Sequence, residues 1–244
     1  MQKGVGESGA VTVPPDGNPV LTRTRAGRAV PAAVVTVTGC LLVLGLLGAG
    51  VRTDFGPQLR LDGVVSEALY AGDSRATALN DLLAVLTAPG LSWFRLLVFL
   101  PVLVILVRRR AWWTAAWVLT AIALIGPLNT LLKHYFGRVR PDFAEGGARL
   151  DSLSYPSGHS SGIATLVTVA LVLAWPFLAA RARHWALAAG VLLVVLVGLT
   201  RMWLGVHFLS DVVGGWVLGV GWALLTALLF GAFAEGRASL RPQE

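Results

Sequence analysis

Three basic residues stand where long apolar runs of this chain begin or end: Lys133, Arg140 and Arg201. A charge inside hydrocarbon costs about 2.5–3.5 kcal/mol, so such residues are kept at a membrane surface or are paired with an anion. Any one of them alone is most simply a side chain that reaches back to the surface. Three of them together favour a site that binds an anion.

A second anion-binding pattern is Ser157-Gly158, which directly precedes an apolar run. Backbone N–H groups at the start of a helix point at a bound phosphate, and glycine lets the backbone come close to it. Taken alone, the pattern is only a good helix start. His159 follows it and can give or take a proton near neutral pH. The sequence therefore places a proton-transfer group beside the expected anion.

His207 and Asp211 are four residues apart, so on a helix they would share one face. A carboxylate that accepts a hydrogen bond from the ring fixes its tautomer and leaves the other ring nitrogen as a nucleophile. On its own, this spacing is usually just a surface pair. Gly205 is expected to allow the turn that brings Arg201 and His207 together.

A zinc site is the alternative for His159, His207 and Asp211, since these residue types bind zinc. The chain has no His-Glu-x-x-His pair and no acidic cluster, and three nearby cations would repel a divalent ion. We therefore expect no metal and no other cofactor. Cys40, the one cysteine, excludes an internal disulfide and is expected to be a small buried residue in an apolar run.

The elements that must position these residues are membrane spans. Of the 244 residues, 55% are hydrophobic and 14% are charged, whereas a soluble domain has about 25% charged residues. A helix needs about 20 apolar residues to cross the bilayer. The long apolar runs predict an all-α integral membrane bundle of six transmembrane helices, over 30–51, 91–107, 111–132, 160–180, 185–203 and 211–234. The run 91–107 carries Arg95 near one end, although its leucine, valine and phenylalanine content still favours insertion.

The parts outside the spans are short. Residues 1–28 are polar and turn-rich and are predicted to be a disordered cytoplasmic tail, 29–234 the membrane domain, and 235–244 a cytoplasmic C-terminal tail. The segment 52–90 mixes charged and apolar residues, which predicts helical pieces lying along the membrane surface. No second soluble domain is expected.

Orientation follows from the basic residues, which are enriched in short cytoplasmic loops. The side that holds both termini has eleven bases and four acids, and the other side has nine of each. Both termini are therefore predicted to be cytoplasmic, and the loops 133–159 and 201–211 extracytoplasmic. The net charge of +7 is then a topology signal and does not indicate a nucleic-acid partner. The preference for arginine over lysine is typical of a bacterial protein from a GC-rich genome.

Three motifs together resemble the signature of the type 2 phosphatidic acid phosphatase (PAP2) family, the lipid phosphate phosphatases that share a fold with vanadium haloperoxidases. They are Lys133-x6-Arg140-Pro141, Pro156-Ser157-Gly158-His159 and Thr200-Arg201-x5-His207-x3-Asp211. Their order, spacing and location on one membrane face agree with the family. Thr200 stands where the family usually has serine, and both residues offer a hydroxyl.

The resemblance implies a role for each motif residue. His207 matches the nucleophile that forms a phosphohistidine, Asp211 the residue that orients it, and His159 the general acid. The family needs no metal. The residues that match the phosphate-binding positions are Lys133, Arg140, Ser157, Gly158 and Arg201.

The leading hypothesis is a multi-pass phosphatase of the cell (inner) membrane that acts on the extracytoplasmic leaflet. Its substrate would be a lipid phosphomonoester or diphosphate such as phosphatidic acid, phosphatidylglycerol phosphate or a polyprenyl diphosphate. A phosphotransferase that passes the phosphoryl group to an alcohol is the alternative. A non-enzymatic lipid-binding or transport protein would need the cations but not the two histidines. The sequence gives no indication of the oligomeric state.

Overall fold

The computed structural model describes residues 19–72, 76–143, 152–233 and 236–240, and their regular elements are helices. In chain order these are α1 (Pro19–Arg52), α2 (Gly56–Leu69), α3 (Thr77–Thr87), the 3-10 turn η1 (Ala88–Gly90), α4 (Ser92–Arg108), α5 (Trp112–Phe136), α6 (Gly158–Ala174), the 3-10 turn η2 (Trp175–Phe177), α7 (Ala180–Trp203) and α8 (Leu209–Phe230).

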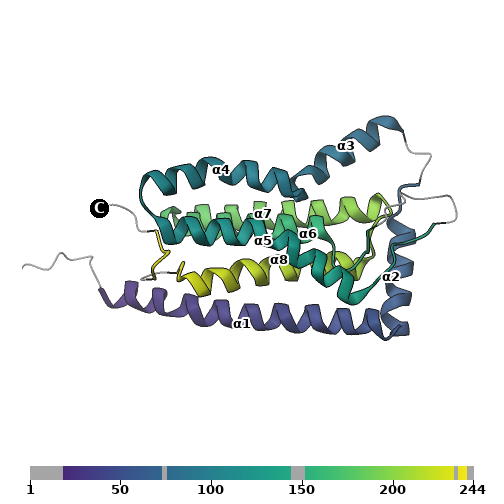
Figure 1. Ribbon diagram of the computed structural model, residues 1–244, viewed down its shortest axis with the longest axis horizontal. Helices are drawn as coiled ribbons and strands as arrows, with labels where there is room; N and C mark the ends of the chain where they lie inside the picture. The colour runs from purple at the N-terminus through teal and green to yellow at the C-terminus, as the bar shows by residue number, and fades with distance from the viewer. Residues whose placement is uncertain (1–18, 73–75, 144–151, 234–235, 241–244) are drawn as a thin grey trace, which may run out of the picture.

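The long helices run side by side, while α2 lies across one end of the bundle and α3 bends away from α4 (Figure 1). Five described helices are long and apolar enough to cross a membrane: α1 from Ala29 on, α5, α6 with η2, α7 and α8. The segments Thr77–Gly90 and Ser92–Arg108 pass the same test only as a pair bent by 52°. The prediction of an all-helical membrane protein is confirmed, and a sixth span depends on counting the bent pair as one crossing.

The bundle has an apolar outside and a partly polar inside. Large apolar side chains on its outer surface are exposed, among them Val35, Leu46, Leu97, Val191 and Leu192. Small polar side chains are buried between the helices, among them Thr114, Asn129, Ser161, Thr165 and Thr226. This distribution suits hydrocarbon, where polar groups must find partners inside the protein.

Glycines let α8 pack closely against α6. A Cβ atom at Gly215 would lie 2.5 Å from the carbonyl oxygen of Ser157, and one at Gly219 would lie 2.4 Å from that of Ser161. Small residues at such positions allow helix backbones to approach in a membrane. This contact fixes the start of α6, which carries the second motif, against the start of α8, where the third motif ends.

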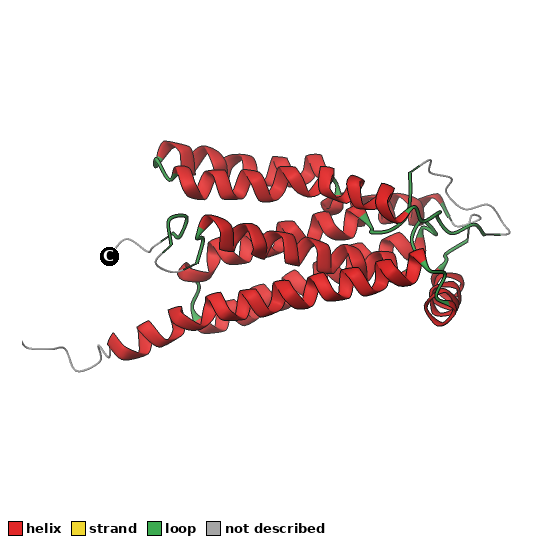
Figure 2. Cartoon of the chain, turned by 60° about the horizontal axis from the view of Figure 1, so that its bottom comes forward, coloured by secondary structure: helices red, strands yellow, loops and turns green. Residues whose placement is uncertain are grey.

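The ends of the chain differ from the prediction. Residues 19–28 were expected to belong to a disordered tail, but they form the first turns of α1, and residues 1–18 lie outside the described part. In the predicted C-terminal tail, residues 236–240 lie against the bundle: Ala238 is buried, and its carbonyl oxygen accepts a 3.0 Å hydrogen bond from Thr114 Oγ1. The start of α1 and this segment share one end of the bundle, opposite α2 and the loops that carry the motifs (Figure 2).

Candidate active site

The first motif is positioned by the end of α5. Lys133 lies in the last helical turn, and Gly137 ends the helix in the left-handed conformation with φ of 69°. After Gly137 the chain continues without regular structure. Val139 is 76% exposed, whereas Arg138 is 8% exposed and Arg140 points toward His207.

The second motif forms the first turn of α6. Ser157 is the N-cap, and its side chain accepts a hydrogen bond from the backbone N–H of Ser160. Its own backbone N–H donates to the carbonyl oxygen of Asp211 at 2.9 Å. From α5, the Asn129 amide donates to the carbonyl oxygen of Pro156 at 3.3 Å. The phosphate-binding turn expected from the sequence is thus held by both neighbouring helices.

The third motif spans the turn from α7 to α8. Gly205 has φ of 69°, and a Cβ atom there would lie 2.7 Å from the ring of Tyr70. His207 precedes α8, so it does not share a helical face with Asp211 as predicted. The two side chains meet because Asp211 folds back over the start of α8, where its Oδ2 accepts from the backbone N–H of Phe208 at 2.9 Å.

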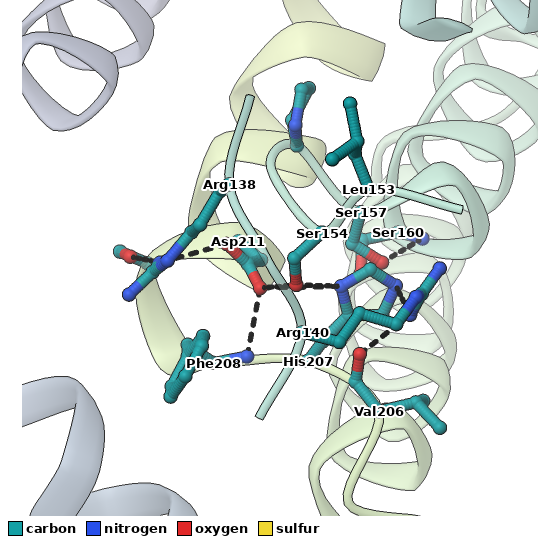
Figure 3. A network of polar contacts seen from close by, with 12 residues as sticks. Arg138, Arg140, Leu153, Ser154, Ser157, Ser160, Val206, His207, Phe208 and Asp211 are labelled. Atoms are coloured by element: carbon teal, nitrogen blue, oxygen red, sulfur yellow. Dashed lines mark hydrogen bonds and ion pairs between the residues drawn. The ribbon is translucent and has the colours of Figure 1, made fainter. Parts of the chain in front are cut away.

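His207 is buried at the centre of a polar network (Figure 3). Its Nδ1 lies 3.3 Å from Asp211 Oδ2 and 3.3 Å from Ser154 Oγ, and Ser154 Oγ also donates to Asp211 Oδ2. On the other side of the ring, Nε2 lies 3.2 Å from Arg140 Nη1. An ionised carboxylate can only accept, so Nδ1 carries the ring proton and Nε2 keeps its lone pair.

Burial lowers the pKa of His207 to about 3, and this outweighs the hydrogen bond to Asp211, which raises the pKa. The positive charges of Arg140 and Arg201 lower it further. Desolvation and nearby cations both disfavour the imidazolium form. The ring is therefore neutral at neutral pH.

The three predicted cations form no ion pair with an acidic side chain among the described residues. Lys133 Nζ donates to the carbonyl oxygens of Leu153 and Ser154. Arg140 donates to those of Ser152 at 2.7 Å and Val206 at 2.6 Å. Bonds to neutral carbonyl groups leave the charges uncompensated, so the site is strongly attractive to an anion.

Arg201 is the most buried of these cations, with 6% of the residue exposed. Its Nη1 donates to Thr87 Oγ1 at 3.0 Å, while its buried Nε has no hydrogen-bond partner in the described part of the chain. An unsatisfied buried donor is costly, and a bound anion would satisfy it.

His159 lies in the first turn of α6, against the bend between α3 and α4. A Cβ atom at Gly90 would lie 2.8 Å from His159 Cβ, so only glycine permits this approach. The positive charges of Lys133, Arg140 and Arg201 are close enough to His159 to interact with it electrostatically. With this residue, the structure brings all eight sequence-predicted site residues to one end of the bundle.

Two charged residues of the network, Arg138 and Asp62, were not predicted as site residues from the sequence. Arg138 donates from Nη1 to Asp211 Oδ1 at 2.8 Å and from Nη2 to Asp62 Oδ2 at 2.6 Å. The backbone N–H of Ser210 donates to Asp62 Oδ1 at 2.8 Å. The pattern Arg138-Val139-Arg140 could have indicated that Arg138 lies near the site, because it stands two residues before a predicted site residue. Nothing in the local pattern around Asp62 predicts its partner.

No group of three His, Cys, Asp or Glu side chains is arranged to hold a metal ion in residues 19–72, 76–143, 152–233 and 236–240. His159, His207 and Asp211 were the set considered for zinc. In the structure the carboxylate of Asp211 accepts hydrogen bonds from Arg138, from Ser154 and from the backbone N–H of Phe208 before α8.

Comparison with known proteins agrees with this geometry. Residues 114–234 match the family model of the PAP2 superfamily. Phosphatidylglycerophosphatase B of Bacillus subtilis is 38% identical over 149 residues, 58% of this chain and 70% of that protein. Undecaprenyl-diphosphatase of Sulfolobus acidocaldarius is 30% identical over 154 residues, 60% of this chain and 68% of that protein.

A crystal structure described as the first transmembrane PAP2 type phosphatidylglycerolphosphate phosphatase from Bacillus subtilis is similar to most of this chain. The TM-score is 0.61 at 31% identity, and the match covers 78% of this chain and 94% of that one. Sequence, fold and site thus agree, and the chain belongs to the PAP2 superfamily and is a membrane phosphatase of that family.

Proposed function

We propose that this protein hydrolyses a lipid phosphomonoester or diphosphate at the extracytoplasmic face of the membrane through a phosphohistidine intermediate. The observation that carries the proposal is the environment of His207. Its Nδ1 is held by Asp211 and Ser154, and its Nε2 faces a cluster of cations that lacks an acidic partner among the described residues. A non-enzymatic lipid-binding site would need the cations but not an oriented, neutral imidazole.

The phosphate group of the substrate is held by Lys133, Arg140 and Arg201 together with the backbone at Ser157 and Gly158. The free Nε of Arg201 and the N–H groups at the start of α6 point to this role. In phosphoryl transfer, negative charge on the equatorial oxygens must be stabilised, and cations that are already in place do this without reorganisation.

In the first step, the lone pair on Nε2 of His207 forms a bond to phosphorus while the bond from phosphorus to the lipid oxygen breaks. The negative charge of the bound phosphate offsets the nearby cations, so His159 can enter this step as imidazolium. It passes its extra proton to the lipid oxygen, and the lipid alcohol leaves. For a diphosphate, the leaving group is the lipid monophosphate. The ring becomes positive, and the carboxylate of Asp211 stabilises it through the Nδ1–H bond.

In the second step, water attacks phosphorus and the bond from Nε2 to phosphorus breaks. His159 now takes the proton of the water, so inorganic phosphate leaves and both histidines return to their starting forms. Two displacements replace one very slow hydrolysis. If a lipid or sugar alcohol replaced water in this step, the protein would be a phosphotransferase.

The names of the relatives suggest two substrate classes, phosphatidylglycerol phosphate and a polyprenyl diphosphate. Phosphatidic acid is the simplest lipid with the required phosphomonoester. We expect the purified protein in detergent to release inorganic phosphate from at least one of these three lipids without any added acceptor and with EDTA present.

This measurement separates the alternatives. Phosphate release that needs an added alcohol would identify a transferase, and strong inhibition by EDTA would restore the metal hypothesis. Vanadate is expected to inhibit, because its trigonal-bipyramidal form imitates the phosphoryl transition state.

The assignment of the site to the extracytoplasmic face rests on the distribution of basic residues between the two ends of the bundle. Arg108 ends α4, and Arg109 and Arg110 follow in the turn to α5, at the end opposite the site. Short loops rich in arginine remain on the cytoplasmic side.

Labelling of introduced cysteines tests this orientation. The natural Cys40 lies within α1, and the unaltered protein therefore measures the background labelling. We expect a Val139→Cys variant to react with a membrane-impermeant maleimide on intact cells, since Val139 is 76% exposed beside the site. An Arg109→Cys variant, exposed at the opposite end, should react only after the cells are permeabilised. The reverse pattern would place the site in the cytoplasm.

A further inference from the structure

Arg95, in the first turn of α4, is a buried cation that the reaction described above does not use. The residue is 2% exposed. Its Nε donates to the carbonyl oxygen of Ile122 at 2.9 Å and its Nη2 to Ser92 Oγ at 3.5 Å. No carboxylate of the described residues lies within 4 Å of it. Since a guanidinium has five N–H donors and a charge that is costly to bury, Arg95 has unfilled capacity for an anion.

The guanidinium of Arg95 lies close to His159 but deeper in the bundle. A Cβ atom at Gly162 would lie 2.7 Å from Arg95 Nη1. Gly162 follows His159 by three residues of α6, which corresponds to about 4.5 Å along the helix. Because α6 runs from the site toward the opposite end of the bundle, Arg95 lies about one helix turn further into the membrane than His159.

One cavity connects the two residues. It has a volume of about 800 Å³, and Arg95 and His159 both line it. Ser92, Asn129 and His134 provide further polar groups on its wall. This volume lies in the usual range for small-molecule sites, so it can hold a lipid headgroup.

The cavity also reaches the lipid-facing surface. Its wall includes the apolar residues Leu91, Ile125 and Leu131. Leu131 is 67% exposed on the outside of α5. An apolar chain can therefore leave the cavity toward the hydrocarbon while the headgroup stays inside.

We propose that Arg95 binds a second phosphate group of the substrate, which lies between the phosphate that is cleaved and the apolar chains. The inference rests on the proposed function. The terminal phosphate occupies the cationic cluster at His207, the second phosphate meets Arg95 one turn deeper, and the chains leave past Leu131. Phosphatidylglycerol phosphate, with its phosphodiester, and a polyprenyl diphosphate share this order of groups. Phosphatidic acid has no second phosphate.

The test is the ratio of kcat/KM for a two-phosphate lipid to kcat/KM for phosphatidic acid, measured by phosphate release in detergent. For Arg95→Met we expect this ratio to fall about 10- to 100-fold, as for the loss of charge-assisted hydrogen bonds. The fall should appear mainly as a higher KM, because the lost contact holds the substrate and the transition state equally well. Arg95→Lys keeps the charge and should recover part of the ratio.

Phe99→Leu is the matched control. Phe99 is buried one helix turn beyond Arg95 on α4 and does not line the cavity. The Phe99→Leu variant should change kcat/KM for both lipids by the same factor, so the ratio should stay as in the unaltered protein. Assaying the two-phosphate lipids separately identifies which linkage Arg95 recognises.

An equal loss toward phosphatidic acid and both two-phosphate lipids in Arg95→Met would overturn the proposal and leave Arg95 a structural tie between α4 and α5. A failure of the proposed function gives another result: the unaltered protein would then release phosphate from none of the three lipids.

Discussion

Replacing His207 by alanine is expected to lower kcat for phosphate release by at least about 10⁴-fold, the scale of losses when a catalytic nucleophile is removed. The reason is chemical: in the proposed mechanism Nε2 of His207 is the atom that bonds to phosphorus, and Asp211 and Ser154 hold the ring that carries it. Phosphate release from phosphatidic acid in detergent measures the effect. His184→Ala is the control, because His184 is exposed near the start of α7, at the opposite end of the bundle, and should retain activity.

Trapping the intermediate makes the test specific to the nucleophile. With a ³²P-labelled substrate, rapid denaturation should yield a labelled protein whose phosphate is lost in acid and kept in base, as expected of phosphohistidine. His207→Ala should carry no label. His159→Ala should accumulate label from an aryl phosphate, because a good leaving group needs no acid in the first step while water still needs the base in the second. Label on His207→Ala would assign the nucleophile to another residue.

Replacing Arg138 by methionine is expected to destabilise the folded protein by about 3–5 kcal/mol, because it leaves two buried carboxylates without their cation. Arg138 bonds to Asp62, which is 2% exposed, and to Asp211, which is fully buried. The midpoint of thermal unfolding in detergent should fall, and activity should fall with it, since Asp211 loses the contact that fixes its second oxygen.

Arg140→Met provides the contrast two residues away. Arg140 has no acidic partner among the described residues, so its loss should reduce activity with little change in the unfolding midpoint. A double-mutant cycle between Arg138→Met and Asp62→Leu should give a coupling energy well above the additivity error of about 0.5 kcal/mol. Equal midpoints for Arg138→Met and Arg140→Met would show that the Asp62–Arg138–Asp211 bridge contributes nothing to stability.

If Arg138→Met lowers both stability and activity, α2 contributes to the site through Asp62, its one buried acidic residue. Asp62 also accepts from the backbone N–H and the hydroxyl of Ser210, next to Asp211. Arg138, Asp62 and Ser154 then act as positioning residues: they hold Asp211, and Asp211 holds the imidazole. None of the three is a specified residue of the motifs that carry the family resemblance, although Arg138 lies between Lys133 and Arg140.

The sequence by itself predicted most of the long helices and the candidate site residues, because both depend on local patterns. A run of about 20 uncharged residues predicts a span wherever it occurs, and the observed α5, α7 and α8 begin within about five residues of the predicted ones. The motif residues could be identified because their chemistry depends on residue type and short spacing. Even the error about His207 and Asp211 was small, since the turn before α8 brings them as close as a shared helical face would have.

Only the tertiary structure decided which charges meet. Asp62 and Arg138 are 76 residues apart in the sequence, and Thr87 and Arg201 are 114 apart. In the sequence, Arg95 is only a charge near one end of the second predicted span. In the structure it lies against Gly162, beside the cavity and His159. No local periodicity encodes such contacts, because they arise from how whole helices pack, and that packing depends on glycines, bends and buried polar partners distributed along the chain.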